Sequence, residues 1–240
     1  MGQLYNDILL AKASGQKLLA ILLDPDKIVW NQLDELVKQI YDSPATHIFV
    51  GGSLVLTNRI GELISAIKQS CPLPIILFPG NPSQISDKAD GILFLSLISG
   101  RNSDFLIGHH INAAPLLKKT TLEIIPTGYI LINGGSETAV LQVSQTQPID
   151  RDNPELAVAT ALAGEMLGNK LIYLEAGSGA KLPVPTVIIK NVAENINIPL
   201  IVGGGITSSA GIQSAYEHGA DMVVIGTAFE NNIHFFNDQP

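Results

Sequence analysis

Short apolar runs recur along the chain, and segments with a helical spacing of apolar residues lie between most of them. The runs predict strands at Leu18–Leu23, His47–Val50, Ile75–Leu77, Gly91–Leu95, Ile130–Ile132, Leu171–Leu174, Leu200–Val202 and Met222–Ile225. The segments between them predict helices at Gln32–Tyr41, Arg59–Gln69, Asp104–Leu117, Pro154–Leu167, Thr186–Asn195 and Ser208–His218. Continuous apolar runs are typical of parallel strands that are buried on both faces. Eight such strands alternating with helices favour a closed (β/α)8 barrel over a doubly wound sheet.

Two stretches break this alternation. Pro79–Lys88 is too short and too rich in turn residues to form a full helix. Asn133–Asn153 is a long polar loop, and loops of that length in a compact domain are often functional. We therefore expect a modified (β/α)8 TIM barrel, with irregular chain in place of the third helix and a single domain over residues 1–240.

The last three predicted strands each end in a turn that is rich in glycine. These turns lie in Leu171–Gly179, Leu200–Ile206 and Met222–Ala228, whose first residues are 29 and 22 positions apart, as repeated β-loop-α units require. Small residues let backbone amides point at an anion without steric hindrance. The loops after strands 7 and 8 of such barrels commonly form a phosphate site. The sequence therefore predicts a site for a small phosphorylated molecule.

An acidic motif, Leu22-Leu-Asp-Pro-Asp-Lys27, follows the first strand and places Asp24 at the same end of the barrel as the glycine turns. A carboxylate beside a phosphate needs a cation between the two, and Mg²⁺ is often shared by one or two carboxylates and a substrate phosphate. The alternative is that Asp24 or Asp26 only caps the following turn. After the second strand, Ser53 offers a hydroxyl to the metal or to a phosphate, or else caps the next helix.

Composition narrows the class of protein and of partner. The 240 residues are 46% hydrophobic and 15% charged, which suits one large domain with buried strands. A net charge of −8 argues against a nucleic-acid partner, because binding a phosphate backbone needs a basic surface. We expect a soluble, cytoplasmic protein, because no apolar run is long enough for a membrane span and the polar start lacks a signal-peptide pattern. Lone Cys71 excludes an internal disulfide and is expected to be buried.

Taken together and in order, the strand-end motifs closely resemble those of the geranylgeranylglyceryl phosphate synthase family. They are Leu-Asp-Pro-Asp-Lys (23–27), Val-Gly-Gly-Ser (50–53), Tyr-Leu-Glu-Ala-Gly-Ser-Gly (173–179), Val-Gly-Gly-Gly-Ile (202–206) and Ile-Gly-Thr-Ala (225–228). The run at 202–206 is common in phosphate-binding barrels, but the run at 173–179 together with the first two motifs is specific. The resemblance implies a barrel without its third helix. It also implies transfer of a prenyl chain from its diphosphate to the free hydroxyl of sn-glycerol 1-phosphate, which forms an ether-lipid precursor.

The resemblance further implies roles for individual residues. Asp24 and Ser53 would bind the Mg²⁺ ion that holds the diphosphate. The residues implied to contact sn-glycerol 1-phosphate are Tyr173, Leu174, Glu175, Ala176, Gly177, Ser178, Gly179, Gly204, Gly205, Gly226 and Thr227. A bacterial branch of the family that transfers a heptaprenyl chain carries Lys-Leu-Asp-Pro at the first strand, where this chain has Leu-Leu-Asp-Pro (22–25). That difference favours a geranylgeranyl donor, with a heptaprenyl donor as the alternative.

Two side chains in the 173–179 run are candidates for chemistry. The attacking hydroxyl must lose its proton as the ether forms, and Glu175 is the only carboxylate in the run, so we expect it to be the general base. Alternatively, Glu175 only binds the glycerol hydroxyls. Tyr173 would orient the glycerol through its hydroxyl, or else it packs in the core with that hydroxyl satisfied.

A prenyl chain also needs an apolar groove, which the missing third helix could open. Phe78, Phe94 and Leu97 are candidate liners, although each also suits ordinary core packing. His109 and His110 are expected at the surface rather than as metal ligands.

Other classes of function stay open if the residues are read without the resemblance. An isomerase or synthase on the same barrel would need a second acid or base at another strand end, and Leu93–Leu97 offers none. A non-catalytic sensor of phosphorylated ligands is disfavoured by Glu175 inside the phosphate turn. Apolar helix faces fit a homo-oligomer as well as a monomer. Composition and spacing alone indicate a phosphate-binding α/β barrel.

Overall fold

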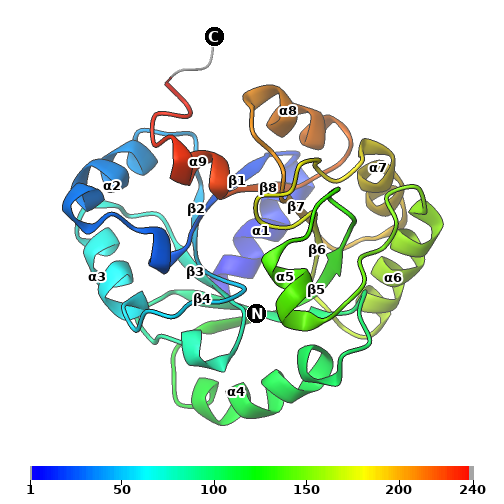
Figure 1. The fold of residues 1–240 in the computed structure, drawn as a ribbon, viewed down its shortest axis with the longest axis horizontal. Helices are drawn as coiled ribbons and strands as arrows, with labels where there is room; N and C mark the ends of the chain where they lie inside the picture. Colours follow the sequence, from blue (N-terminus) through cyan, green and yellow to red (C-terminus); the bar gives the residue numbers. More distant parts are fainter. Residues whose placement is uncertain (1, 238–240) are drawn as a thin grey trace.

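Eight parallel strands close into a barrel in sequence order in the computed structural model, which describes residues 2–237 (Figure 1). The strands are β1 (Leu18–Leu23), β2 (His47–Gly52), β3 (Ile75–Pro79), β4 (Gly91–Leu97), β5 (Glu123–Leu131), β6 (Leu171–Glu175), β7 (Leu200–Gly203) and β8 (Met222–Ile225). The first and last strands pair directly, with Leu18 opposite Met222. The predicted barrel is confirmed. Because all strands run in parallel, their carboxyl ends meet at one end of the barrel.

Helices surround the strands as an outer ring formed by α2, α3, α4, α6, α7 and α8 (Figure 1). The helices are α1 (Gln3–Ser14), α2 (Leu33–Tyr41), α3 (Ile60–Ser70), α4 (His109–Leu117), α5 (Ala139–Ser144), α6 (Pro154–Met166), α7 (Thr186–Asn195), α8 (Ser209–Glu217) and α9 (Thr227–Asn231). Between β3 and β4, the described chain forms only the 3-10 turn η3 (Pro82–Gln84). The predicted loss of the third helix is therefore confirmed.

Several boundaries differ from the sequence-based prediction. Strand β5 begins at Glu123 rather than Ile130, because Pro126, Thr127 and Gly128 interrupt its apolar run without ending the strand. Helices α1, α5 and α9 were not expected. The helix predicted at residues 104–117 begins with a π-helical turn, η4 (Asp104–Gly108), which continues into α4. Cys71 is free and buried, as predicted.

Helix α1 closes the amino-terminal end of the barrel. It lies across the centre of the ring in Figure 1, and its Tyr5 and Ile8 are buried together with side chains of the barrel interior. Its first amides, Leu4 N and Tyr5 N, donate to the Glu123 carboxylate at 2.8 and 2.9 Å, and Lys12 pairs with Asp221 at 2.9 Å. With that end closed, the accessible hollow lies at the carboxyl ends of the strands.

An aromatic layer fills the barrel below that hollow. The Tyr173 ring lies 5.5 Å from the Phe78 ring and 5.3 Å from the Tyr129 ring, measured between centroids, and Phe78 stacks on Phe49 at 6.4 Å. These large rings leave little space in the interior, as in other barrels whose centre is a packed core. They therefore form the floor of any site above them.

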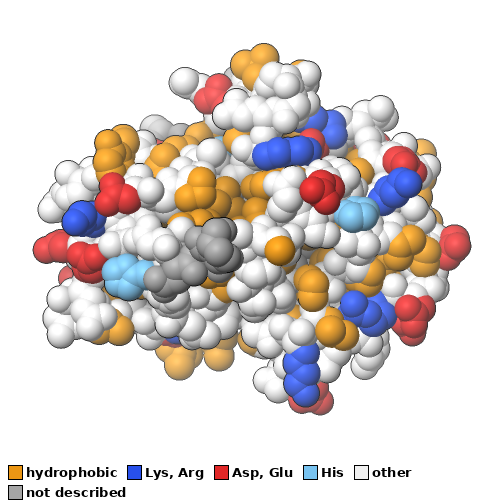
Figure 2. All heavy atoms as spheres, turned by 90° about the horizontal axis from the view of Figure 1, so that it is seen from above, with side chains coloured by type: hydrophobic (Ala, Val, Ile, Leu, Met, Phe, Trp, Pro, Cys, Tyr) orange, Lys and Arg blue, Asp and Glu red, His pale blue; other side chains and the backbone are white. Residues whose placement is uncertain are grey.

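The outer wall carries mixed charge. Figure 2 shows acidic, basic and hydrophobic side chains interspersed on the face of the molecule that it views. Within residues 2–237, no helix is long and apolar enough to cross a membrane.

Candidate active site

Two adjoining hollows open at the carboxyl ends of the strands. The first, here called the polar pocket, has a volume of about 1240 Å³ including its mouth and is lined by the loops after β1, β2, β6, β7 and β8. The second, the apolar pocket, has about 760 Å³ and lies between β3, β4, η3 and α4, on the side where the third helix is absent. Ser53, Phe78, Tyr129 and Val140 line both. The two pockets therefore adjoin, with these four residues at their shared boundary.

The predicted glycine turns come together around the polar pocket. Gly204 and Gly205 have φ values of +80° and +69°, which residues with a side chain rarely adopt. A Cβ at Gly204 would overlap Glu175 Oε1 and lie 2.6 Å from Gly177 N and 2.7 Å from Ala176 N. Both amides already donate within the chain, Ala176 N to Gly203 O at 3.1 Å and Gly177 N to Glu175 Oε1 at 2.6 Å, so glycine at 204 permits the close approach of the loops after β6 and β7.

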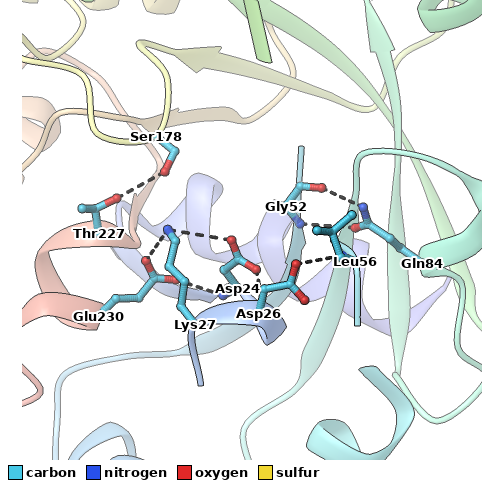
Figure 3. Close-up of polar contacts among 9 residues, drawn as sticks. All are labelled: Asp24, Asp26, Lys27, Gly52, Leu56, Gln84, Ser178, Thr227 and Glu230. Atoms are coloured by element: carbon cyan, nitrogen blue, oxygen red, sulfur yellow. Dashed lines mark hydrogen bonds and ion pairs between the residues drawn. The ribbon is translucent and has the colours of Figure 1, made fainter. Parts of the chain in front are cut away.

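Most of the predicted substrate-binding residues line this pocket. Those that do are Tyr173, Glu175, Gly177, Ser178, Gly179, Gly204, Gly205, Gly226 and Thr227. Ser178 Oγ lies 3.3 Å from Thr227 Oγ1, so the loops after β6 and β8 meet (Figure 3). Leu174 and Ala176 are not among the lining residues, because their side chains pack in the core cluster that includes the surrounding helices. Strand alternation turns them away from the barrel interior.

Glu175 ends β6 inside the polar pocket, with only 5% of its surface exposed. Its Oε1 accepts a hydrogen bond of 2.6 Å from Gly177 N, which fixes the carboxylate. Burial raises the pKa of Glu175 to about 7, against the lowering effect of that bond and of nearby Tyr173. A carboxyl group with this pKa can exchange a proton near neutral pH, as a general base must.

Tyr173 packs in the core, but its hydroxyl is placed differently from what either alternative required. Its ring is fully buried in the aromatic layer, so it does pack in the core. Its hydroxyl lies close enough to Glu175 to affect that group's pKa, yet it forms no hydrogen bond of good geometry within the described chain. The expectation of a satisfied core hydroxyl is therefore wrong. A buried hydroxyl without a partner is costly unless a ligand supplies one.

Asp24 follows β1 and lies at the rim of the polar pocket (Figure 3). Its Oδ1 accepts from Asp26 N at 3.0 Å and so caps the 3-10 turn η1 (Pro25–Lys27), while Oδ2 faces Gly52. Burial raises the pKa of Asp24, against the opposing effects of the Asp26 amide and the Lys27 ammonium. One oxygen of Asp24 therefore caps the turn, while the other faces Gly52 and Lys27 at the rim of the pocket.

Asp26 and Ser53 differ in their positions. The Asp26 carboxylate accepts from Leu56 N at 2.7 Å and Thr57 N at 2.8 Å, which ties down the loop after β2. Ser53 lines both pockets. Helix α3 has Arg59 at its N-cap, so the alternative that Ser53 caps the next helix is wrong.

The donor set fits a metal ion that substrate completes. The described residues contain no cluster of three or more His, Cys, Asp or Glu side chains suited to a metal ion. Asp24 Oδ2 and the nearby Ser53 hydroxyl supply hard oxygen ligands, and Mg²⁺ typically takes one or two carboxylates together with phosphates and water. These residues therefore fit a shared Mg²⁺ site and not an all-protein cage.

Three side chains of the site were missed from the sequence: Glu230, Gln84 and Lys27. Glu230 accepts from Asp24 N at 3.0 Å and from Lys27 Nζ at 2.9 Å. Gln84, in η3, donates to Gly52 O at 2.8 Å and accepts from Gly80 N at 3.2 Å, which holds the loops after β2 and β3 together (Figure 3). Lys27 belongs to the Leu-Asp-Pro-Asp-Lys motif, but the motif did not indicate a role for its ammonium group. Glu230 and Gln84 carry no local signal, because their partners are distant in sequence.

The apolar pocket contains all three predicted liners, Phe78, Phe94 and Leu97. His109 and His110 line it as well, and the expectation that His110 lies at the surface is wrong. His110 is 8% exposed, and its Nε2 lies 3.0 Å from Ser96 Oγ. His110 shares one face of α4 with the buried residues Ala113 and Leu117, so the ring faces β4 instead of solvent. Burial lowers the pKa of His110.

Comparison with known proteins agrees with this geometry. The model of the PcrB family matches residues 13–239. A geranylgeranylglyceryl phosphate synthase of Flavobacterium johnsoniae is 64% identical over 234 residues, which cover 98% of this chain and 96% of the relative.

Solved structures extend the likeness to three dimensions. The (S)-3-O-geranylgeranylglyceryl phosphate synthase of Thermoplasma acidophilum, in complex with its substrate sn-glycerol-1-phosphate, superposes with a TM-score of 0.92 at 33% identity, covering 99% of this chain and 95% of that one. A tryptophan synthase α-subunit of Pyrococcus furiosus, at 12% identity and a TM-score of 0.55 over 90% of this chain and 89% of that one, shares the fold alone. The chain therefore belongs to the PcrB family, the prenyltransferase family of the geranylgeranylglyceryl phosphate synthases.

Proposed function

We propose that the protein transfers a prenyl group, geranylgeranyl in the first instance, from its diphosphate to the 3-hydroxyl of sn-glycerol 1-phosphate. The observation that carries this proposal is the shared boundary of the two pockets. A polar pocket with glycine-rich loops and a buried carboxylate adjoins an apolar pocket of about 760 Å³, its opening included. A reaction that joins a phosphorylated polyol to a long hydrocarbon needs both kinds of surface at one point.

The glycerol phosphate fits the polar pocket. The glycine turn at Gly204 and Gly205 and the hydroxyls of Ser178 and Thr227 offer donors to a phosphate. The Thermoplasma relative binds sn-glycerol-1-phosphate, which supports the same acceptor here. Fixing the phosphate at these loops holds the glycerol hydroxyls above the Glu175 carboxylate, so that proximity replaces a chance encounter.

The prenyl chain fits the apolar pocket, with its diphosphate at the shared boundary near Ser53. Asp24 and Ser53 would hold a Mg²⁺ ion there. When bound, that ion supplies Lewis-acid stabilisation of the charge that develops on the leaving diphosphate. The partly exposed Lys27 ammonium lies at the same rim and adds positive charge near the leaving group.

Glu175 acts as general base in this account. The 3-hydroxyl oxygen forms a bond to the first carbon of the prenyl chain, the bond from that carbon to the diphosphate oxygen breaks, and the hydroxyl proton passes to Glu175. A pKa near 7 places this carboxyl where it can accept that proton and release it again. The unpartnered Tyr173 hydroxyl orients the glycerol beside it.

A heptaprenyl donor is the second candidate, since the volume of the apolar pocket does not by itself set a chain length. Incubation of the protein and Mg²⁺ with sn-glycerol 1-phosphate and prenyl diphosphates of several lengths, followed by product mass measurement, tests the proposal. The expected result is an ether product from geranylgeranyl diphosphate, with sn-glycerol 3-phosphate as the control acceptor giving far less. Product formation only with a longer donor would favour the second candidate, and absence of any product would overturn the proposal.

A further inference from the structure

We infer that Glu230, on α9, is a positioning residue of the metal site, which holds the Lys27 ammonium away from Asp24 so that the Asp24 carboxylate stays free for a divalent cation. The inference rests on the proposed function, in which Asp24 binds that cation. It assigns a task to a residue at the end of the chain that has no part in the chemistry itself.

Both oxygens of Glu230 are engaged at the site. Oε1 accepts from Asp24 N at 3.0 Å, and Oε2 accepts from Lys27 Nζ at 2.9 Å (Figure 3). The Glu230 side chain is only 8% exposed, against 47% for Lys27. An ion pair with one buried partner and a second hydrogen bond on that partner has a defined geometry, unlike a pair between two exposed side chains. Glu230 therefore fixes the ammonium.

The arrangement leaves one oxygen of Asp24 for a ligand. Oδ1 already accepts from Asp26 N at 3.0 Å. Oδ2 lies 3.8 Å from Lys27 Nζ, which is 0.9 Å farther than the distance from Nζ to Glu230 Oε2. The ammonium and Oδ2 thus form a long ion pair, and a small movement of the ammonium would shorten it into a hydrogen bond that a cation would have to displace (Figure 3). Glu230 offsets the Lys27 charge and disfavours that movement.

Glutamine at position 230 separates the hydrogen bond that Glu230 accepts from Asp24 N from its ion pair with Lys27. Its carbonyl oxygen can still accept from Asp24 N, but it carries no negative charge for Lys27. In E230Q, the ammonium should shift to Asp24 and compete with the metal ion. Removal of the ammonium as well, in E230Q/K27M, should restore the free carboxylate. A residue with a merely structural role would give no such recovery.

The experiment measures binding of Mn²⁺ together with inorganic diphosphate to the protein by water-proton relaxation enhancement, since diphosphate supplies the ligands that complete the site and Mn²⁺ shares the preference of Mg²⁺ for oxygen ligands. The dissociation constant should rise about fivefold or more in E230Q, because the partly exposed Lys27 ammonium then pairs with Asp24, the metal ligand. It should return to within about twofold of wild type in E230Q/K27M by the same reasoning. E217Q, which removes an exposed glutamate at the end of α8, controls for the change in net charge.

The outcomes test two assignments separately, Glu230 as a positioning residue and Asp24 as a metal ligand. An unchanged dissociation constant in E230Q, or a double variant as weak as E230Q, would overturn the role of Glu230, provided that circular dichroism shows an intact fold. D24N distinguishes this failure from failure of the proposed function. Loss of Mn²⁺ binding in D24N with no effect of E230Q would refute only the inference about Glu230, whereas wild-type binding in D24N would remove the metal from Asp24 and refute both.

Discussion

Replacement of Glu175 by glutamine separates the charge of this carboxylate from its shape. Glutamine fills the same buried volume and keeps an oxygen that can accept the 2.6 Å hydrogen bond from Gly177 N. It cannot take the proton of the glycerol hydroxyl. A general base contributes about 10²–10⁴-fold to a rate, so the single-turnover rate of E175Q should fall by that factor. The affinity for sn-glycerol 1-phosphate should change far less, because the phosphate contacts are untouched.

The same replacement should remove a pH-dependent destabilisation of the fold. Burial raises the pKa of Glu175 from 4.5 to about 7, so between these values the folded protein binds more protons at this site than the unfolded chain does. The free energy of unfolding therefore falls as pH rises through this window. The difference of about 2.5 units corresponds to at most about 3 kcal/mol. E175Q has no ionised form, so its gain in stability over wild type should grow between about pH 4.5 and about pH 7 and reach its full size above about pH 7.

Three measurements on one variant test this reasoning. Calorimetry gives the dissociation constant for sn-glycerol 1-phosphate, rapid quench gives the single-turnover rate, and urea unfolding at about pH 5 and about pH 8 gives the two stabilities. Wild-type kcat/KM should rise with pH up to about 7, and that step should be absent in E175Q. A large loss of affinity with a normal rate at saturation would make Glu175 a glycerol ligand and refute its role as base. Equal stability gains at both pH values would refute the charge argument.

Further variants test the rest of the polar pocket. Asp24→Asn should abolish magnesium-dependent turnover with the fold intact by circular dichroism, and near-normal turnover at low Mg²⁺ would remove Asp24 from the site. Gly204→Val should weaken sn-glycerol 1-phosphate binding by several times the ~1.5 kcal/mol of one charge-assisted hydrogen bond. Its control is Gly15→Val, where φ is also positive (+76°) but an added Cβ meets no described atom within 4 Å, and equal affinities in the two variants would place the phosphate elsewhere. Tyr173→Phe removes a buried hydroxyl without a partner, so kcat/KM should fall by up to about tenfold while the free energy of unfolding stays equal or rises. A lower stability with unchanged kcat/KM would show that the hydroxyl serves only the fold.

The strand-end positions of the site could be predicted because parallel strands bring their carboxyl ends to one face. Asp24 after β1, Ser53 after β2, Glu175 at the end of β6 and the glycines after β7 and β8 are far apart in sequence, yet all of them line the polar pocket. The irregular chain after β3 could also be predicted from the sequence, because prolines and small polar residues exclude a full helix there.

The site contacts and element boundaries that the sequence did not predict depend on interactions that no local sequence pattern encodes. Glu230 reaches Lys27 across 203 sequence positions, and Gln84 reaches Gly52 across 32. Strand β5 runs through Pro126 because pairing with its neighbours outweighs the poor strand preference of proline. His110 is buried because it lies on the same helix face as Ala113 and Leu117, although a polar histidine gives no apolar signal of its own.

The most direct test of the proposed reaction follows the oxygen that becomes the ether. The acceptor is sn-glycerol 1-phosphate labelled with ¹⁸O at its 3-hydroxyl, incubated with geranylgeranyl diphosphate, Mg²⁺ and the protein, and the product is analysed by mass spectrometry. If the hydroxyl oxygen attacks the prenyl carbon, the ether retains the label and the released diphosphate carries none. Label in the diphosphate, or an ether without label, would contradict the proposed reaction.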